Sequence, residues 1–403
     1  MLLPSEAEKI ILDSVPVLPA GDCPLSHALG RVLREPIRAD RDLPPFDRVT
    51  MDGYALRLDD DGGGNGAARR EFRVIGVQAA GASPLAINNA GECVEIATGA
   101  MLPAGANAVA PYEDTTRDGE IVTITASSAP VAGQNIHRRA SDHRQGGILV
   151  PAGARMSPRE IAVAAACGCA QVRVSAQPRV AIITTGDELV EVSNPAPAPH
   201  QIRRSNDLAL QAALQAAGYP GAACFHLPDD AHEIEERLKH IIAESEYDVV
   251  LITGGVSRGK FDYVPGALAK LGVEKKFHGV AQRPGKPLWF GVTPAPRRAP
   301  VFALPGNPVS THVCFHRYVL PALAHMSGAA PATPLMVELA GPPAPATPAP
   351  AQLTRYVPVT LREGRAFPAE TNTSGDFAAL VGTDGFVELP PETKGGSVRF
   401  YPW

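Results

Sequence analysis

The sequence predicts a multidomain protein in which a central, mostly parallel α/β domain is combined with smaller β domains. The first reason is length, because the chain has 403 residues and single hydrophobic cores seldom grow past about 250 residues. The second is that strand-like and helix-like runs alternate in the middle of the chain, as they do in βαβ units. The third is that short β-branched runs, separated by Gly, Pro and Asn, lie on either side of that region.

The first forty residues predict two short amphipathic helices. Ser5 can cap the first helix, and Ser26 can cap a second helix that ends before Pro36. Neither helix could bury its apolar face alone. We therefore expect both helices to pack against another part of the chain.

A further helix is predicted at residues 156–166. Ser157 can cap it, Pro158 suits its first turn, and Glu160 completes a capping box. Because this stretch resembles the opening helices more than its neighbours, we expect one elongated, helical linker domain made of two pieces. These pieces are residues 1–43 and 145–172, and the inserted small β domain is residues 44–144, with predicted strands at 72–77, 93–99 and 120–126.

Residues 173–327 are predicted to form the α/β domain. Its strands are expected at 172–185, 222–227, 248–254, 288–292 and 301–305. Its helices are expected at 208–218, 232–245 and 264–272, with a last one from Pro308 to about His325. Residues 328–403 are predicted to form a C-terminal, barrel-like β domain with strands at 336–340, 355–361, 385–390 and 398–402.

Composition excludes several classes of protein. The formal net charge of −5 argues against a general nucleic-acid binder, since affinity for phosphate backbones comes from clustered Lys and Arg. Six cysteines without a CxxC pair favour a reducing, cytosolic setting. The N-terminus lacks the features of a signal peptide, and no run of about 18 apolar residues occurs. We therefore expect a cytoplasmic protein with no membrane or nucleic-acid partner.

Four loops of the predicted α/β domain carry polar or glycine-rich sequence. In open parallel sheets, ligands bind outside the carboxyl ends of strands, where helix N-termini present unsatisfied N–H groups. Glycine lets the backbone approach an anion closely at such a place. The predicted binding residues are Thr185, Gly186, Asp187 and Glu188 in the first loop; Gly254, Gly255, Ser257, Gly259 and Asp262 in the second; Arg283 and Lys286 in the third; and Pro305, Gly306, Asn307 and Pro308 in the fourth.

Each loop has a simpler interpretation when it is taken alone. Two glycines after a strand are often only a tight turn, and Asp187 with Glu188 can be a helix cap and a first-turn acid. Four such loops in one region favour a site. The sequence has neither the Walker spacing nor a GxGxxG fingerprint, which argues against an ATPase and a dinucleotide dehydrogenase. In the small β domain, Asp52 and Thr98 alone are best interpreted as structural residues.

Seven segments, taken in this order and spacing, resemble the molybdopterin molybdenumtransferase family. They are PPFDRVTMDGYALR, IATGAMLPAGANAV, ITTGDELV, SNDLAL, LITGGVSRGKFDY, RPGKPLWFG and LPGNPVS. Smaller molybdopterin-binding proteins share single motifs, but the MDGYA and TGA segments ahead of the GGVS segment distinguish the long family. The resemblance extends over nearly the whole chain.

The resemblance implies an activity and a set of site residues. Members of the family insert molybdate into adenylylated molybdopterin and release AMP with a divalent cation, commonly Mg²⁺. By resemblance, GGVSRGKFD and LPGNPVS would hold the pterin phosphate, and Arg283 and Lys286 would attract molybdate or the diphosphate. The other implied binding positions are Ser205, Asn206, Asp229 or Asp230, Arg355 and Ser374, and the positions implied in turnover are Asp52, Thr98, Asp142, Glu188 and Asp262.

The acids are suited to the cation, and the basic residues are suited to the oxyanion. Hydrolysis of a phosphoanhydride needs Mg²⁺ held by one or two carboxylates, so Asp187, Glu188 and Asp262 are the expected metal ligands. Molybdate is itself an oxyanion and should prefer Arg, Lys and backbone N–H groups. Arg283 stands where the family commonly has Lys, and an Arg can hold an anion with two parallel hydrogen bonds.

The sequence leaves other points open. It departs from the family pattern at Arg48-Val49-Thr50, at Ala140-Ser141 and at Arg258. The family also implies a homodimer with a site shared across the interface, and contact with other cofactor-biosynthesis proteins. Two alternative functions remain, which are adenylyl transfer to molybdopterin and a non-catalytic role as a cofactor carrier or scaffold.

Overall fold

The structure is a computed structural model that describes residues 1–58, 70–127, 130–244, 246–255, 262–341, 352–369, 373–391, 393 and 395–403. Backbone contacts divide the chain into two units. Unit 1 is Met1–Glu35, Ala152–Ile161 and Ala170–Trp403, and unit 2 is Pro36–Pro151 and Ala162–Cys169. The finer division into four domains stays a prediction. Within the described ranges, no helix is long and apolar enough to cross a membrane.

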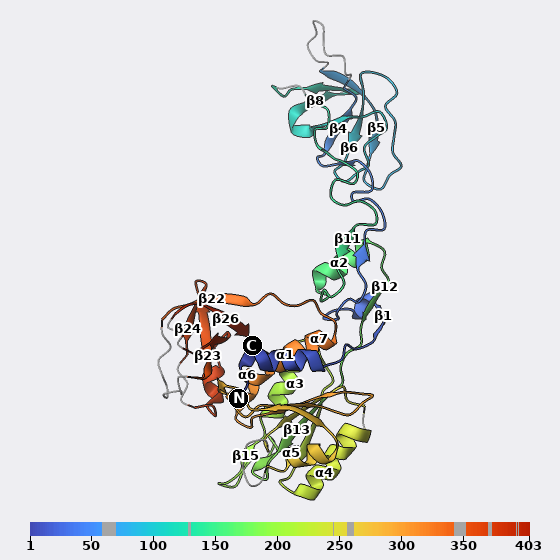
Figure 1. Cartoon of the computed structure of the whole chain (residues 1–403). Coiled ribbons are helices and arrows are strands. Elements are labelled where there is room, and N and C mark those ends of the chain that lie inside the picture. The colour runs from blue at the N-terminus through green and yellow to red at the C-terminus, as the bar shows by residue number, and fades with distance from the viewer. Residues whose placement is uncertain are drawn as a thin grey trace. The chain divides into compact units, whose positions relative to one another are not determined.

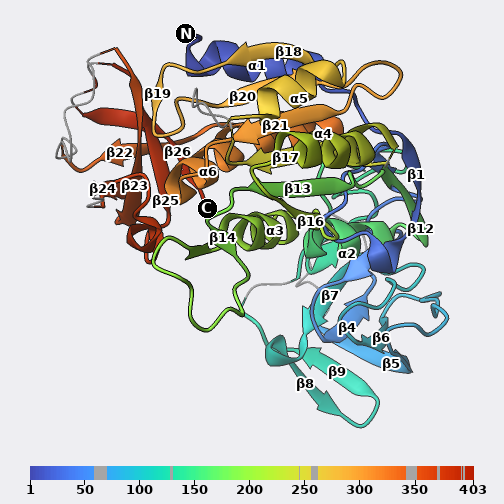
Figure 2. The ribbon, with the colours of Figure 1, turned by 90° about the horizontal axis from the view of Figure 1, so that it is seen from below.

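Unit 1 is built around a six-stranded sheet. Its strands are β13 (Val180–Thr185), β16 (Ala223–Leu227), β17 (Val249–Thr253), β18 (Glu274–His278), β20 (Trp289–Val292) and β21 (Pro300–Leu304). They lie in the order β16-β13-β17-β21-β20-β18, as Figure 2 shows. The first four are parallel to one another, whereas β20 runs antiparallel to both of its neighbours. The prediction of a largely parallel sheet is confirmed.

Helices cover both faces of this sheet (Figure 1). They are α1 (Pro4–Ser14), α3 (Asn206–Ala216), α4 (Ala231–Lys239) with its continuation η3 (His240–Glu244), α5 (Val264–Lys270), and the continuous run α6 (Pro308–Cys314), η4 (Phe315–Val319) and α7 (Leu320–Met326). Alternate residues of each strand face opposite sides, so Leu251 packs with α1, α3 and the α6–α7 run, while Ile252 packs with α4 and α5. The helices predicted for this region are confirmed.

The predictions for the N-terminal segment are partly wrong. Helix α1 forms, but Leu3 rather than Ser5 is its cap, because Pro4 takes the first helical position and Glu6 accepts a hydrogen bond from the Leu3 amide at 2.7 Å. The second predicted helix is absent from this described segment, which has only the short turn η1 (Leu25–His27). Gly30 there has φ 75°, and its amide donates to the carbonyl of Met156 instead of continuing a helix.

The strand predicted at residues 172–185 is in fact two strands. Strand β12 (Gln171–Ser175) pairs with β1 (Ala20–Pro24), and β13 begins only at Val180, after Pro178 has interrupted the run. The capping of helix α2 (Pro158–Ala166) agrees with the prediction. The Ser157 amide donates to Glu160 at 2.8 Å, and the Arg159 amide donates to the Ser157 hydroxyl at 3.2 Å.

The C-terminal part of unit 1 is a second six-stranded sheet. Its strands are β19 (Gln282–Arg283), β22 (Leu335–Leu339), β23 (Thr354–Arg362), β24 (Arg365–Pro368), β25 (Gly385–Leu389) and β26 (Gly396–Pro402). The pairings β23-β24-β22-β26-β25 close on β23 again, so these five strands form a ring, and β19 pairs with β23 from outside it. The predicted barrel-like domain is confirmed, although β24 was not predicted.

Unit 2 contains the predicted small β domain. Its main sheet has the order β7-β4-β6-β5-β9-β8, with β4 (Gly53–Leu56), β5 (Glu71–Gln78), β6 (Glu92–Ile96), β7 (Ala108–Pro111), β8 (Thr115–Asp118) and β9 (Ile121–Ile124). Strands β5, β6 and β9 match the prediction, and β4 forms at the Met51-Asp52-Gly53 turn, where the sequence indicates a strand, whereas the short strands β7 and β8 were missed. The remaining pairs are β2 (Ile37–Arg38) with β11 (Ile148–Val150), and β3 (Arg48–Val49) with β10 (Ile136–His137).

Candidate functional site

The strand order of the central sheet creates a topological switch point at the carboxyl ends of its strands. Strand β13 lies between β16 and β17. Of these three strands, β13 comes first in the chain, β16 second and β17 third. The connections that leave β13 and β17 at their carboxyl ends therefore lead to opposite sides. Such a topological switch point is where open α/β sheets bind ligands. The first two predicted loops begin at these two strand ends.

Glycine brings the loops after β13 and β17 into contact. Gly254 has φ 90°, and a Cβ atom on it would lie 2.7 Å from the Thr185 carbonyl oxygen. Gly255 has φ 61°, and its Cβ would lie 2.9 Å from the Thr185 hydroxyl. A Cβ on Gly306, in the loop after β21, would lie 3.5 Å from the Gly254 Cα atom. Three of the four predicted loops therefore meet at one place.

The Thr185 hydroxyl lies at this junction without a partner. The side chain is 4% exposed, and among the described residues its oxygen makes no hydrogen bond. Buried polar atoms without partners are rare in folded proteins. The hydroxyl is thus available to a ligand that reaches the two glycines.

Two further segments approach the loop after β21. The side-chain amide of Asn206, at the start of α3, donates to the Gly306 carbonyl at 2.8 Å. The side-chain amide of Asn307 donates to the Ser374 hydroxyl at 2.7 Å, which links the C-terminal part of unit 1 to the same loop. Pro308 begins α6, while Ser205 stands at the cap position of α3 without a side-chain hydrogen bond to it. Pro305 accepts a hydrogen bond through its carbonyl from Thr311 at 2.6 Å.

Carboxylates gather beside the loop after β13. Asp187 accepts a hydrogen bond from the Asp229 amide at 3.0 Å, and the Glu188 carboxylate folds over Gly186, where a Cβ would lie 2.6 Å from it. Burial raises the pKa of Asp229, and the charges of Asp187, Glu188 and Asp262 raise it further, against one backbone hydrogen bond that lowers it. The predicted metal ligands are therefore near one another. Among the described residues, however, no three such side chains converge closely enough to hold a metal ion by themselves.

The side chains of Asp229 and Asp230 lie in different environments. Asp230 caps helix α4, where its carboxylate accepts hydrogen bonds from the amides of His232 and Glu233, each at 2.9 Å. Its carboxylate is thus already engaged by the helix terminus. Asp229 faces the other acids, and the sequence could not separate these two adjacent residues.

The basic residues form a second group. Arg283 on β19 is the register partner of Arg355 on β23, and Lys286 follows Arg283 across a Pro-Gly turn. Arg283 and Lys286 are exposed and Arg355 is half-buried. Within the described part of the chain, none of the three forms an ion pair, and no hydrogen bond joins them to the three glycine loops. Like charges on adjacent strands destabilise a sheet, so this pair is suited to an anion.

The remaining predicted residues lie in unit 2 or outside the described chain. Asp52 accepts a hydrogen bond from the Thr98 amide at 2.7 Å, which lowers the pKa of Asp52. Asp142 contacts His137, a residue that was not predicted, at 2.9 Å, and His137 contacts Arg48 at 3.1 Å. Ser257 and Gly259 of the second loop, with Arg258 between them, lie outside the described residues.

Models of known protein families match the regions of the chain described above. Family models match residues 3–168 as the MoeA N-terminal region (domain I and II), residues 181–325 as a probable molybdopterin binding domain, and residues 343–403 as the MoeA C-terminal region (domain IV). A molybdopterin molybdenumtransferase of Synechocystis sp. is 38% identical over 386 residues, which is 93% of each chain. One of Staphylococcus epidermidis is 32% identical over 373 residues, or 92% of this chain and 87% of that protein.

A solved structure agrees with these matches. The molybdopterin biosynthesis moeA protein from Pyrococcus horikoshii OT3 superposes with a TM-score of 0.81 at 30% sequence identity, and the alignment covers 100% of both chains. The relatives, the three family models and this fold cover the regions in which the glycine loops, the acids and the basic pair occur. The chain belongs to the molybdopterin molybdenumtransferase family.

Proposed function

We propose that the protein inserts molybdate into adenylylated molybdopterin and releases AMP, as a transferase of molybdenum cofactor biosynthesis. The observation that carries the proposal is the meeting of the loops after β13, β17 and β21 at the switch point, beside the buried Thr185 hydroxyl, which makes no hydrogen bond to any described residue. The curated relatives bear the name of this activity. A switch point with backbone amides and glycines suits a ligand with several phosphate oxygens.

Each group of residues has a part in the proposed reaction. Gly254, Gly255 and the Thr185 hydroxyl would hold phosphate oxygens, because no side chain separates the ligand from the backbone there. Asn206, Asn307 and Ser374 would bound the same place through the loop after β21. Arg283, Lys286 and Arg355 would receive molybdate, since an oxyanion neutralises their mutual repulsion. Ser257 and Gly259 keep their predicted part in the cradle.

The acids fit a divalent cation that is held jointly by protein and substrate. Mg²⁺ usually binds through one or two carboxylates together with substrate phosphates and waters. Asp187, Glu188 and Asp262 could each supply a ligand, and their repulsion of Asp229 favours a positive charge at this place. When bound, the cation would neutralise the developing charge on the phosphoanhydride. In unit 2, Asp52, Thr98 and Asp142 stay predicted participants in turnover.

The compartment and the assembly are also proposals. All six cysteines are free thiols, which supports work in the reducing cytoplasm. Unit 1 carries an apolar hollow of about 530 Å³ beside Phe377, which is 56% exposed, and Val381, which is 84% exposed. A second copy of the chain could cover these side chains. Contact with other cofactor-biosynthesis proteins stays a prediction.

The activity is tested by incubating the protein with adenylylated molybdopterin, molybdate and Mg²⁺. AMP should appear only when all three are present, and its release should fall by about a hundredfold in Asp262→Asn, which loses a carboxylate beside the cation. Asp118→Asn, at an exposed position of β8, should be as active as the wild type. If no AMP forms under conditions that activate a Synechocystis relative, the proposal is wrong. Formation of the adenylate from ATP would favour the adenylyltransferase alternative.

The contact between the loops is tested with Gly254→Ala. The added Cβ meets the Thr185 carbonyl and the backbone would hold a positive φ, so affinity for adenylylated molybdopterin should fall by about tenfold or more. Gly266→Ala is the matched control, because nothing lies within 4 Å of that position in α5 and alanine favours helix. Equilibrium binding measures both variants. A folded Gly254→Ala protein that binds as tightly as the wild type would remove this contact from the site.

The acidic group predicts a pH dependence of stability. The folded state raises the pKa of Asp229, so its contribution to stability is fully present below the unfolded pKa and is lost as pH rises through the folded pKa. Asp229→Asn should therefore melt at a higher temperature than the wild type at pH 7, and the difference should vanish as pH falls below about 4. A melting-temperature difference that is equal at both pH values would contradict this account.

The homodimer is tested by light scattering in solution. The mass should be twice that of the 42.3 kDa chain, and Val381→Asp should shift it toward a single chain by placing a charge on the apolar face. A wild-type protein with the mass of one chain at micromolar concentration would exclude the dimer. A dimer that persists in Val381→Asp would place the interface elsewhere.

A further inference from the structure

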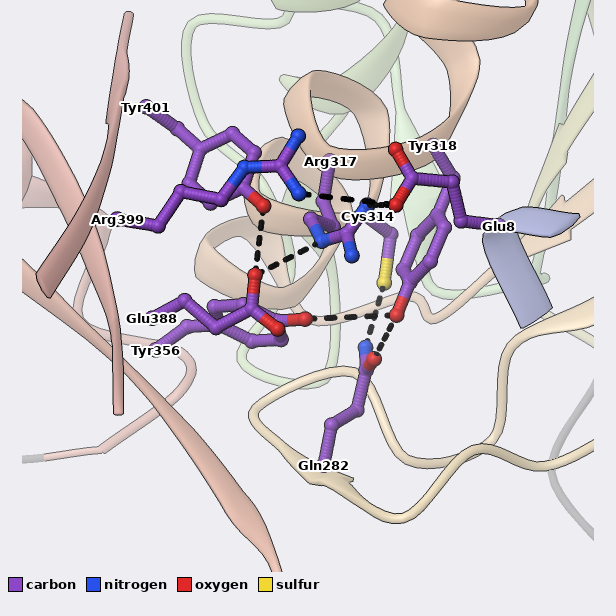
Figure 3. Close-up of polar contacts among 9 residues, drawn as sticks. All are labelled: Glu8, Gln282, Cys314, Arg317, Tyr318, Tyr356, Glu388, Arg399 and Tyr401. Carbon is purple, nitrogen blue, oxygen red and sulfur yellow. Dashed lines mark hydrogen bonds and ion pairs between the residues drawn. The ribbon is translucent and has the colours of Figure 1, made fainter. Parts of the chain in front are cut away.

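A buried polar cluster joins the C-terminal sheet to the helices of unit 1. Figure 3 shows its nine members, which come from α1, β19, α6, η4, β23, β25 and β26: Glu8, Gln282, Cys314, Arg317, Tyr318, Tyr356, Glu388, Arg399 and Tyr401. None belongs to the glycine loops or the acidic group. The cluster includes residues adjacent in sequence to two of the basic residues, Arg283 and Arg355.

Gln282 fixes the shape of the turn that carries Arg283 and Lys286. Its side chain is fully buried, and its amide nitrogen donates to the Gly285 carbonyl at 3.2 Å and to the Cys314 sulfur at 3.5 Å. Its amide oxygen accepts a hydrogen bond from the Tyr318 hydroxyl, as Figure 3 shows. Gly285 has φ 90°, and a Cβ on it would lie 2.5 Å from the Cys314 sulfur. The side-chain amide of Gln282 thus holds this turn from its buried side.

Strand geometry determines where the basic residues lie relative to the buried cluster. Gln282 and Tyr356 point into the cluster, and because successive residues of a strand face opposite sides, their neighbours Arg283 and Arg355 point away from it. The Tyr318 hydroxyl lies 3.5 Å from the Tyr356 hydroxyl, so one helix residue contacts both strands. The strand register sets the two arginines opposite each other at a cost in repulsion.

The charged half of the cluster holds Tyr318 in place. Arg317 is 1% exposed and pairs with Glu8 at 2.9 Å and with Glu388 at 3.1 Å. Its guanidinium lies over the Tyr318 ring, 5.0 Å from the ring centre. A buried charge that is paired on both sides is costly to displace, so the helix around Tyr318 cannot shift easily.

We propose that Gln282 and Tyr318 are positioning residues that hold Arg283, Lys286 and Arg355 in the arrangement that receives a tetrahedral oxyanion. This inference rests on the proposed function, in which that oxyanion is molybdate. Neither residue touches the substrate. They act by fixing the turn after β19 and its register with β23, so that the two guanidinium groups stay together without an acid between them. Preorganised donors bind an anion more tightly than mobile ones.

The test compares Gln282→Met and Tyr318→Phe with the wild type. Both variants keep the shape of the side chain and remove the hydrogen bond between the two residues, so titration calorimetry with molybdate should give about tenfold weaker binding. The KM for molybdate in AMP release should rise by the same factor, whereas the KM for adenylylated molybdopterin should stay unchanged. The control is Tyr219→Phe, which also removes a buried tyrosine hydroxyl, here one bonded to Arg155 at 2.9 Å. It should bind molybdate as the wild type does.

The outcomes separate this inference from the proposed function. If Arg283→Met loses molybdate binding while Gln282→Met and Tyr318→Phe bind it as tightly as the wild type, the positioning role is wrong and the oxyanion site stands. If Arg283→Met also binds as the wild type does, the oxyanion site itself is wrong. If the two variants lose affinity for molybdate and for adenylylated molybdopterin alike, the effect is general damage and the inference is overturned.

Discussion

The missing side chain at Gly254 is the constraint on which the site depends. Because no Cβ is present, the chain leaving β17 turns at φ 90° directly against the Thr185 carbonyl, and the loop after β21 lies so near that a Cβ on Gly306 would be 3.5 Å from the Gly254 Cα atom. Three parallel strands end at one edge of the sheet, but parallel strands alone would leave their loops separate. The glycines bring the backbones together and leave a buried hydroxyl facing the junction.

The proposed site separates opposite charges into two groups. Asp187, Glu188, Asp229 and Asp262 gather near the loop after β13, whereas Arg283, Lys286 and Arg355 gather where β19 meets β23. A reaction that cleaves a phosphoanhydride and also binds an oxyanion needs both a cation ligand set and an anion receptor. If the two groups were mixed, they would neutralise each other in ion pairs. The buried cluster around Gln282 and Arg317 keeps the basic group in its own place.

Much of the fold could be predicted from the sequence, because strong local patterns agree with it. The apolar runs of β17 and β21 are buried on both faces, and the capping box at Ser157 forms as expected. The second predicted N-terminal helix does not form, because the backbone amides of Gly30 and Leu33 donate to the carbonyls of Met156 and Ala154, which are distant in sequence. The split of β12 from β13 follows from Pro178, which has no backbone N–H to donate to a sheet.

The positions of single side chains were harder to predict. Nothing in the sequence distinguishes Asp229, beside the other acids, from Asp230, which caps α4. Gln282 gave no signal at all, since its partners Tyr318 and Gly285 come together only through tertiary packing. By contrast, the glycine loops were found because glycine after a buried strand constrains the backbone directly.

In the proposed function, the loops after β13, β17 and β21 together hold the phosphorylated ligand. Hydrogen exchange of the backbone amides, followed by mass spectrometry with and without adenylylated molybdopterin, measures this most directly. The ligand should slow exchange at Thr185 to Glu188, at Gly254 and Gly255, and at Gly306 and Asn307 in parallel. Protection confined to one of these loops, or found only elsewhere in the chain, would contradict it.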